Sequence, residues 1–395
     1  MMGIDQIAKK YNAEIALVVL LLRIKIETAK PSEIQLFFNN NDPDLDFVLE
    51  LVKAHELTSI IFSIKEGREI FSTQEKHTQI SREVDLRGRN NLLILAELVR
   101  LNRYFMEQEI PILFYKGVLL SKILFDDFTT RATSDIDILI RSDDFIKIRE
   151  VLLSSGYEEV YYYPETYPGY FLSHTRESAF RKKFTGGHYI YVELQWSPLP
   201  KHYGIPYNND YFFGHSEPVL LTGETVKTLG LTQHLFILMI HHGLSDLWRN
   251  LKHVFDIALF IIRYDNQIDW KELSKMEKTW HISHNFSCGW NLVNNLFGVS
   301  SFKADTWKAK EENVQDALNS LLSYPLLSKN KKNARALQRQ LKLCDGRRER
   351  NALLKGYLKI ALWPSLIDLE NIKLPRALFP LYFITKRFRF LFKKK

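Results

Sequence analysis

The sequence predicts an α+β protein in which a small mixed β-sheet is flanked by helical regions on both sides along the chain. Apolar residues recur at helical spacing in the first 105 residues and again after residue 215, whereas short β-rich runs separated by turns lie between them. A chain of 395 residues with 46% hydrophobic content can bury a large core. We therefore expect an N-terminal helical region over residues 1–105, a β-containing core over 106–215 and a C-terminal helical region over 216–395.

The N-terminal region begins with a strongly apolar run, IALVVLLL at Ile15–Leu22. This run is too short to cross a bilayer, Arg23 follows it, and no small-residue cleavage site comes after it. It is therefore interpreted as a core helix, and the protein is expected to be cytoplasmic. Two further helices are predicted from DPDLDFVLELVKAHEL, which opens on capping residues, and from NNLLILAELVRLNRYFMEQ, which has helical periodicity.

The core region predicts alternating strands and helices. A β-rich run at IPILFYKG is followed by a helix at VLLSKILF, and SDIDILI is the next strand. The helix after it is expected to begin at Ser142 as N-cap and to stop at Gly156. ESAFRKKF and HYIYVELQW are expected to form a hairpin around the turn at residues 185–187, and the signal after residue 215 is helical, through TQHLFILMIHHGL, LKHVFDIALFII and KNKKNARALQRQLK.

Two aspartates stand one residue apart inside the apolar strand SDIDILI. Because side chains alternate along a strand, Asp135 and Asp137 project from the same face, about 7 Å apart by strand rise. Two carboxylates so close repel each other, and a cation between them removes that cost. Hard oxygen ligands of this kind suit Mg²⁺.

Other residues extend this pattern. Glu193 is an acid flanked by apolar residues in YVELQW, and if its strand lies beside SDIDILI, three carboxylates meet at one spot. Three acids can hold two metal ions, the arrangement that serves in-line phosphoryl or nucleotidyl transfer. Lys116 and Gly117 stand at a strand end just before a helix, where free N–H groups let phosphates approach.

The order of these motifs resembles the nucleotidyltransferases of the DNA polymerase β superfamily, and in detail the branch called the uncharacterised nucleotidyltransferase family. The matching segments are EIPILFYKGVLL, RATSDIDILI, LLSSGY, YVELQW and HHGLSDLWRNLKHVFDIA, so the resemblance extends from about residue 45 to about residue 262. It implies a nucleotidyltransferase core in the middle of the chain. It also implies transfer of a nucleoside monophosphate from an NTP to a hydroxyl-bearing acceptor, with release of pyrophosphate.

The resemblance assigns roles residue by residue. It implies that Asp135 and Asp137 bind the magnesium–nucleotide, and that Glu193 completes the catalytic metal site and helps to deprotonate the acceptor. It also implies that Lys116 and Gly117 hold the triphosphate. Arg131 is either a further phosphate contact or a surface partner of Asp126 or Asp127.

The sequence departs from the pattern at four points. A Lys-Gly pair replaces the usual Gly-Gly or Gly-Ser, and about 17 residues separate it from Asp135, more than is usual. Within the branch, Gln195 and Asp246 stand where histidine is frequent. The first two departures bear on how the triphosphate is bound and leave the carboxylates in place, and the last two leave the roles of positions 195 and 246 open.

Two other clusters allow more than one interpretation. His241 and His242, with Asp246 nearby, could form a zinc site, but no cysteine or third ligand with suitable spacing accompanies them. Packing of His242, Trp248 and Asp256 against the sheet, with a part in lining the acceptor pocket, is the interpretation favoured by the sequence. The aromatic run Tyr161–Phe171 either stacks on a base or sugar or forms a surface loop packed on itself.

Charge and cysteine content restrict the partners. The net charge is +8, but six cations lie in the last ten residues, so the body of the chain carries only about +2. This near-neutral body argues against a large nucleic-acid footprint. The basic aromatic tail LYFITKRFRFLFKKK either contacts an anionic membrane surface peripherally or docks on the body. Cys288 and Cys344 lack a metal-ligand pattern, which favours free thiols.

Three functions remain open from the sequence. The first is an active nucleotidyltransferase that uses two Mg²⁺ ions and an NTP, which the presence of all three carboxylates favours. The second is a nucleotide-binding or regulatory protein that kept the fold without the chemistry. The third is a toxin-like enzyme that modifies RNA, resembling the abortive-infection nucleotidyltransferases.

Overall fold

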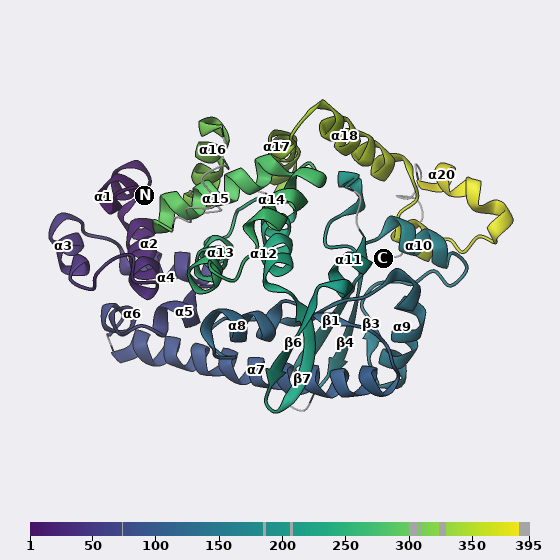
Figure 1. Cartoon of the computed structure of the whole chain (residues 1–395), viewed down its shortest axis with the longest axis horizontal. Helices are drawn as coiled ribbons and strands as arrows, with labels where there is room; N and C mark the ends of the chain where they lie inside the picture. The colour runs from purple at the N-terminus through teal and green to yellow at the C-terminus, as the bar shows by residue number, and fades with distance from the viewer. Residues whose placement is uncertain are drawn as a thin grey trace.

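A computed structural model describes residues 1–72, 74–184, 187–205, 208–299, 307, 310–323 and 329–386, with side chains left out at 74–75 and 329–335. It confirms the α+β class. A five-stranded mixed sheet lies between helices from the two ends of the chain (Figure 1). Among the described residues, no helix has both the length and the apolar character that spanning a bilayer requires.

The N-terminal region is helical, as predicted. Its helices are α1 (Ile4–Lys10), α2 (Ala13–Lys25), α3 (Glu33–Asn40), α4 (Leu45–Ala54), α5 (Thr58–Phe62), α6 (Lys65–Ile70) and α7 (Gln74–Glu107). The apolar run Ile15–Leu22 lies in α2 and is almost completely buried, which confirms the core helix. Buried Arg23 at the end of this run donates to the carbonyl oxygens of Met2 and Leu296, so α2 is tied to the C-terminal helices. The division into three regions stays a prediction.

Helix α7 runs along the whole lower edge of the molecule in Figure 1 and contacts α8, β2 and β7. Its buried Asn91 donates to the carbonyl oxygens of Phe128 and Arg131, at 2.7 and 2.8 Å, and accepts from the N–H of Thr133. A single side chain of the N-terminal region thereby fixes the segment that leads into the aspartate strand.

The central sheet has the order β1-β2-β5-β4-β3. Its strands are β1 (Leu113–Phe114), β2 (Asp135–Leu139), β3 (Glu158–Glu159), β4 (Glu177–Lys183) and β5 (Tyr189–Gln195). Strands β2 and β5 are parallel, and the other pairs are antiparallel. The predicted hairpin is confirmed as β4–β5, although two of its three turn residues, 185 and 186, lie outside the described residues.

Short helices connect the strands: α8 (Gly117–Phe125), α9 (Phe145–Ser154), α10 (Pro168–His174) and α11 (Asn209–Gly214), with 3-10 turns at Ser142–Asp144 and Lys201–Tyr203. The strand, turn and helix predicted around Lys116 are confirmed as β1 and α8. The prediction of Ser142 as an N-cap is wrong. Its hydroxyl bonds Asp143 instead, because the 3-10 turn separates it from the first turn of α9.

The aromatic run Tyr161–Phe171 is not a loop packed on itself. Part of it forms α10, and the rings of Tyr163 and Phe171 meet edge-on in the core, where both also pack at a tilt against Phe145. The hydroxyls of Tyr167 and Tyr170 bond the carbonyl oxygens of Leu374 and Pro364 near the end of the chain. This region therefore anchors the C-terminal segment.

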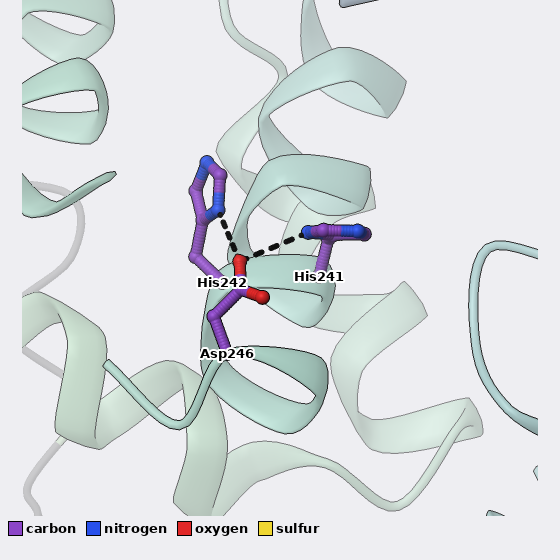
Figure 2. A group of neighbouring side chains, drawn as sticks. All are labelled: His241, His242 and Asp246. Atoms are coloured by element: carbon purple, nitrogen blue, oxygen red, sulfur yellow. Dashed lines mark hydrogen bonds and ion pairs between the residues drawn. The ribbon is translucent and has the colours of Figure 1, made fainter. Parts of the chain in front are cut away.

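The C-terminal region begins with a hairpin, β6 (Ser216–Leu221) and β7 (Glu224–Leu229), so the prediction of only helical structure after residue 215 is wrong. The helices that follow are α12 (Leu231–Ile240), α13 (Leu251–Tyr264), α14 (Trp270–Thr279), α15 (Ser283–Phe297), α16 (Glu311–Leu322), α17 (Lys329–Leu343), α18 (Arg347–Leu362), α19 (Leu366–Asn371) and α20 (Tyr382–Thr385), with a 3-10 segment at Arg376–Leu381. A π-helical turn, η3 (His241–Ser245), extends α12 (Figure 2). Residues 387–395, which carry most of the basic aromatic tail, lie outside the described residues.

Candidate active site

Parallel pairing of β2 with β5 brings the predicted carboxylates together. Asp137 is directly opposite Glu193 in the register of the two strands. Asp135 lies two residues before Asp137, so its side chain projects from the same face of the sheet. Asp137 is only 6% exposed. The structure thus places all three acids at one edge of a shared cavity.

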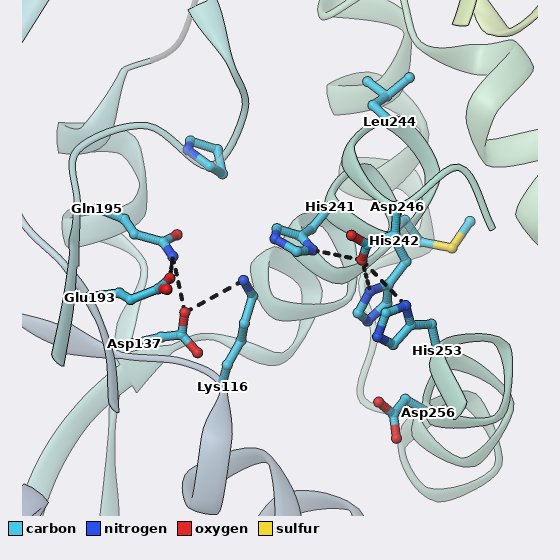
Figure 3. Close-up of polar contacts among 12 residues, drawn as sticks. Lys116, Asp137, Glu193, Gln195, His241, His242, Leu244, Asp246, His253 and Asp256 are labelled. Atoms are coloured by element: carbon cyan, nitrogen blue, oxygen red, sulfur yellow. Dashed lines mark hydrogen bonds and ion pairs between the residues drawn. The ribbon is translucent and has the colours of Figure 1, made fainter. Parts of the chain in front are cut away.

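Gln195, at the end of β5, links two of these acids. Its Nε2 donates to Asp137 Oδ1 at 3.0 Å and to Glu193 Oε2 at 3.1 Å (Figure 3). The Tyr115 hydroxyl bonds Gln195 Oε1 and therefore holds the amide with its N–H groups toward the carboxylates. At this position, where the resemblance noted in the sequence implies a histidine, glutamine supplies a donor to both acids.

Lys116 and Gly117 lie at the junction of β1 and α8, beside the acids. The Lys116 ammonium is 3.7 Å from Asp137 Oδ1, beyond hydrogen-bond distance, and Figure 3 shows it between the carboxylates and His241. Gly117 has a φ of +58°, and a Cβ at this position would lie 2.9 Å from the backbone oxygen of Asp135. Only glycine allows this close approach of α8 to β2. The first N–H groups of a helix have no intrahelical acceptor, so the start of α8 suits an anion.

The cavity has a volume of about 580 Å³. Besides the acids and Lys116-Gly117, the cavity is lined by residues 132–134 and by three further cations, Lys252, Arg176 and Arg87. Each of these cations forms an ion pair: Lys252 with Glu56, Arg176 with Glu177, and Arg87 with Glu83, which lies outside the cavity lining. Lys116 contacts one of the clustered acids, whereas each of these other three cations has an acidic partner outside the cluster. This makes Lys116 the cation placed to meet the phosphates of a metal-bound nucleotide.

Arg131 also lines the cavity, but its partner differs from the surface acids considered from the sequence. Its Nε and Nη2 donate to both oxygens of Asp256 on α13, with distances between 2.9 and 3.2 Å. Asp126 instead pairs with Lys122, and Asp127 accepts from Thr129 and Thr130. The surface pairing is therefore wrong, and the phosphate contact of Arg131 stays a prediction.

Burial and mutual repulsion change the acidity of the site. Burial, followed by the charges of Asp137 and Glu193, raises the pKa of Asp135 to about 7. Burial and the charges of Asp137 and Glu177 also raise the pKa of Glu193. Both shifts mean that the ionised cluster lacks compensating positive charge, which a bound cation would supply.

We expect the free energy of unfolding of the metal-free protein to decrease as the pH rises from about 4 to about 7. In this range Asp135 keeps its proton in the folded chain, where its pKa is about 7, and loses it in the unfolded chain, where the pKa is near 3.8. The folded state then binds more protons, so stability falls with increasing pH.

Asp135→Asn should remove this part of the pH dependence and make the protein more stable than wild type at pH 8. Urea unfolding at pH 4.5 and pH 8 in the presence of EDTA measures both effects. A variant whose stability falls with pH as steeply as that of wild type would exclude Asp135 as the responsible group.

A group of histidines forms the opposite wall of the cavity. His241 and His242 come from η3, and His253 comes from α13. Burial lowers the pKa of His241 to about 4 and also lowers the pKa of His242 and His253. The sequence pointed to the first two residues, but His253 is a member that spacing could not reveal, because it belongs to the next helix.

Residues 41–298 match the family model described as "Uncharacterised nucleotidyltransferase". Among solved structures, the chain is similar to the crystal structure of an antigenic nucleotidyltransferase-like protein from Paracoccidioides brasiliensis, with 16% sequence identity and a TM-score of 0.31. The similarity covers 56% of this chain and 95% of that one. No curated protein matches the chain. Because the family model matches more than half of the sequence, the chain belongs to the uncharacterised nucleotidyltransferase family.

Proposed function

We propose that the protein transfers a nucleoside monophosphate from an NTP to a hydroxyl group of an acceptor and releases pyrophosphate. The observation that carries this proposal is the parallel register of β2 and β5, which sets Asp137 opposite Glu193 with Asp135 on the same face. Family membership supports nucleotidyl transfer in general. The metal, the nucleotide and the acceptor are part of the proposal.

The residues of the site fit Mg²⁺. Three carboxylates meet at one end of the cavity, and burial together with their mutual repulsion raises the pKa of Asp135 and Glu193. Two Mg²⁺ ions, when bound, would polarise the phosphates and lower the pKa of the acceptor hydroxyl. Asp135 and Asp137 would hold both ions, and Glu193 would complete the site on the acceptor side.

The side chains around the acids would bind the triphosphate and position the carboxylates during transfer. Lys116 and the first N–H groups of α8 would bind the triphosphate, and the Gln195 amide would keep Asp137 and Glu193 in place. The acceptor oxygen attacks the α-phosphorus while the bond to the pyrophosphate oxygen breaks. The acceptor proton passes to the Glu193 carboxylate, and the leaving pyrophosphate stays neutralised by Lys116.

NTP binding should depend on a divalent cation. Without one, the triphosphate would meet the unscreened charges of Asp137 and Glu193, which like-charge repulsion disfavours. Calorimetric titration of ATP, GTP, CTP and UTP with Mg²⁺ and with EDTA tests this and reports the preferred base. Equal affinity in the two conditions would contradict the metal site.

The acceptor can be identified with the same preparation. Cell extract incubated with the protein, Mg²⁺ and labelled NTPs, then analysed by mass spectrometry, separates small-molecule, lipid-linked, protein and RNA products. Label on RNA would favour the toxin-like alternative. Mg²⁺-dependent NTP binding without any labelled product would favour a regulatory protein.

A further inference from the structure

The histidine wall of the cavity contains a second cluster of metal-ligating side chains. In η3, the N–H of Asp246 bonds the carbonyl oxygen of His241, five residues earlier, and this wider turn brings the Asp246 side chain back to the two histidines (Figure 2). The donor atoms of His241, His242 and Asp246 all lie within 4.8 Å of one another. Turns of this kind occur frequently at functional sites.

The distances within this cluster match a coordination shell. Asp246 Oδ2 is 3.2 Å from His241 Nδ1 and 3.2 Å from His242 Nδ1. His253 Nδ1 lies 3.3 Å from the same oxygen, and its ring stacks on that of His242. Ligands at about 2.0–2.1 Å from a tetrahedral Zn²⁺ are separated by about 3.3–3.4 Å. The observed oxygen–nitrogen separations are therefore compatible with neighbouring ligands around one ion.

Hydrogen bonding alone does not account for the cluster. Within the described part of the chain, only His242 has the geometry of a good hydrogen bond to Asp246, whereas the buried Nδ1 atoms of His241 and His253 lie near the same oxygen without that geometry. Buried polar nitrogens without partners are costly and uncommon in native structures. A bound cation would accept the lone pairs of both nitrogens.

The surrounding structure holds the turn rigidly. A Cβ at Gly243 would collide with the Asn285 side chain, whose Oδ1 accepts from Trp248 Nε1 and whose Nδ2 donates to the Met239 carbonyl oxygen. Trp248 itself has a φ of +53°, a left-handed conformation that is strained for a bulky residue. The position of Asp246 is thus fixed by buried contacts outside the cluster.

We propose that His241, His242 and Asp246 bind a divalent transition-metal ion of the Zn²⁺ class, with His253 as the adjacent imidazole that can complete the shell. The two or three imidazole nitrogens favour such an ion over Mg²⁺, which prefers oxygen ligands. This site is distinct from the carboxylate cluster, since Lys116 lies between them in Figure 3. The three histidines line the cavity, so the ion would face the same space as the nucleotide site.

Cobalt(II) is a direct probe of this site because its visible absorption reports the coordination geometry. Titration of the metal-free protein with Co²⁺ in excess Mg²⁺, without NTP, should give one equivalent of bound ion, and Zn²⁺ should displace it. The double variant His242→Gln/Asp246→Asn should weaken binding by more than about 100-fold, beyond the roughly 10–100-fold cost of losing an outer-shell partner.

Three further proteins complete the experiment. His241→Gln alters a partly exposed ligand, so a weakened site in this variant with an unchanged melting temperature excludes misfolding as the cause. His281→Gln, at an exposed histidine 4.0 Å from Glu349, is the matched control and should bind like wild type. Asp135→Asn/Asp137→Asn should also keep Co²⁺ binding, which separates this proposal from the proposed transferase activity. Absence of a stoichiometric ion in wild type, or loss of binding only in the aspartate variant, would overturn it.

Discussion

Glu193→Gln should lower transferase turnover by about two orders of magnitude or more, while NTP affinity changes little. Glu193 lies opposite Asp137, and in the proposed mechanism its charge is needed for the metal and the activated oxygen during attack. Glutamine keeps the shape of the side chain and can still accept the Gln195 hydrogen bond. Steady-state kinetics and calorimetric NTP binding on the same preparation measure the two effects separately.

Asp137→Asn should impair both turnover and NTP binding, because in the proposed mechanism the cation that Asp137 holds carries the triphosphate. Glu158→Gln is a matched control in the same sheet. Glu158 lies on the edge strand β3, pairs with Arg181 on β4 and does not line the cavity. A Glu193→Gln protein that melts like wild type and keeps full turnover would refute the assignment.

The sequence predicted those parts of the fold that depend on local pattern. Helical periodicity located α7, α12 and α13, a continuous apolar run located α2, and strand alternation located β2 and β5. The hairpin β6–β7 was missed because its turn carries only half of the usual sequence signal. Both turn residues have a positive φ, which Gly223 suits, whereas Thr222 is a β-branched residue that seldom adopts it. The helix α10 could not be predicted from local pattern, because Tyr170 within it and Tyr167 just before it bond Pro364 and Leu374, about two hundred positions later.

For the candidate site too, the sequence predicted the residues that a local pattern identifies and missed those that depend on packing. Alternation along one strand gives Asp135 and Asp137, and a single assumption about strand neighbours adds Glu193. The hydrogen bond from Tyr115 to Gln195 joins residues 80 positions apart and depends on β1 lying beside β2. Similarly, His253 reaches Asp246 only because α13 folds back along η3. Contacts between side chains on separate helices or strands depend on how those elements pack, and the periodicity of a single segment does not predict them.

The buried pair of Arg131 and Asp256 is expected to have the largest effect on stability. The two side chains are only 7% and 0% exposed, and three hydrogen bonds join them. Asp256→Ala leaves a guanidinium buried without its partner, so the free energy of unfolding should fall by about 3–5 kcal/mol. Urea unfolding measures this loss. A decrease below about 1 kcal/mol would mean that the pair contributes no more than an exposed ion pair.

The double variant Arg131→Met/Asp256→Leu then separates structure from phosphate binding. Apolar side chains of similar size remove both charges together, so this variant should recover most of the stability that Asp256→Ala loses. Because Nε and Nη2 of Arg131 are already engaged by Asp256, the double variant should lose much less NTP affinity than Lys116→Ala. An equal loss in the two proteins would make Arg131 a phosphate ligand, and a double variant as unstable as Asp256→Ala would contradict the desolvation argument.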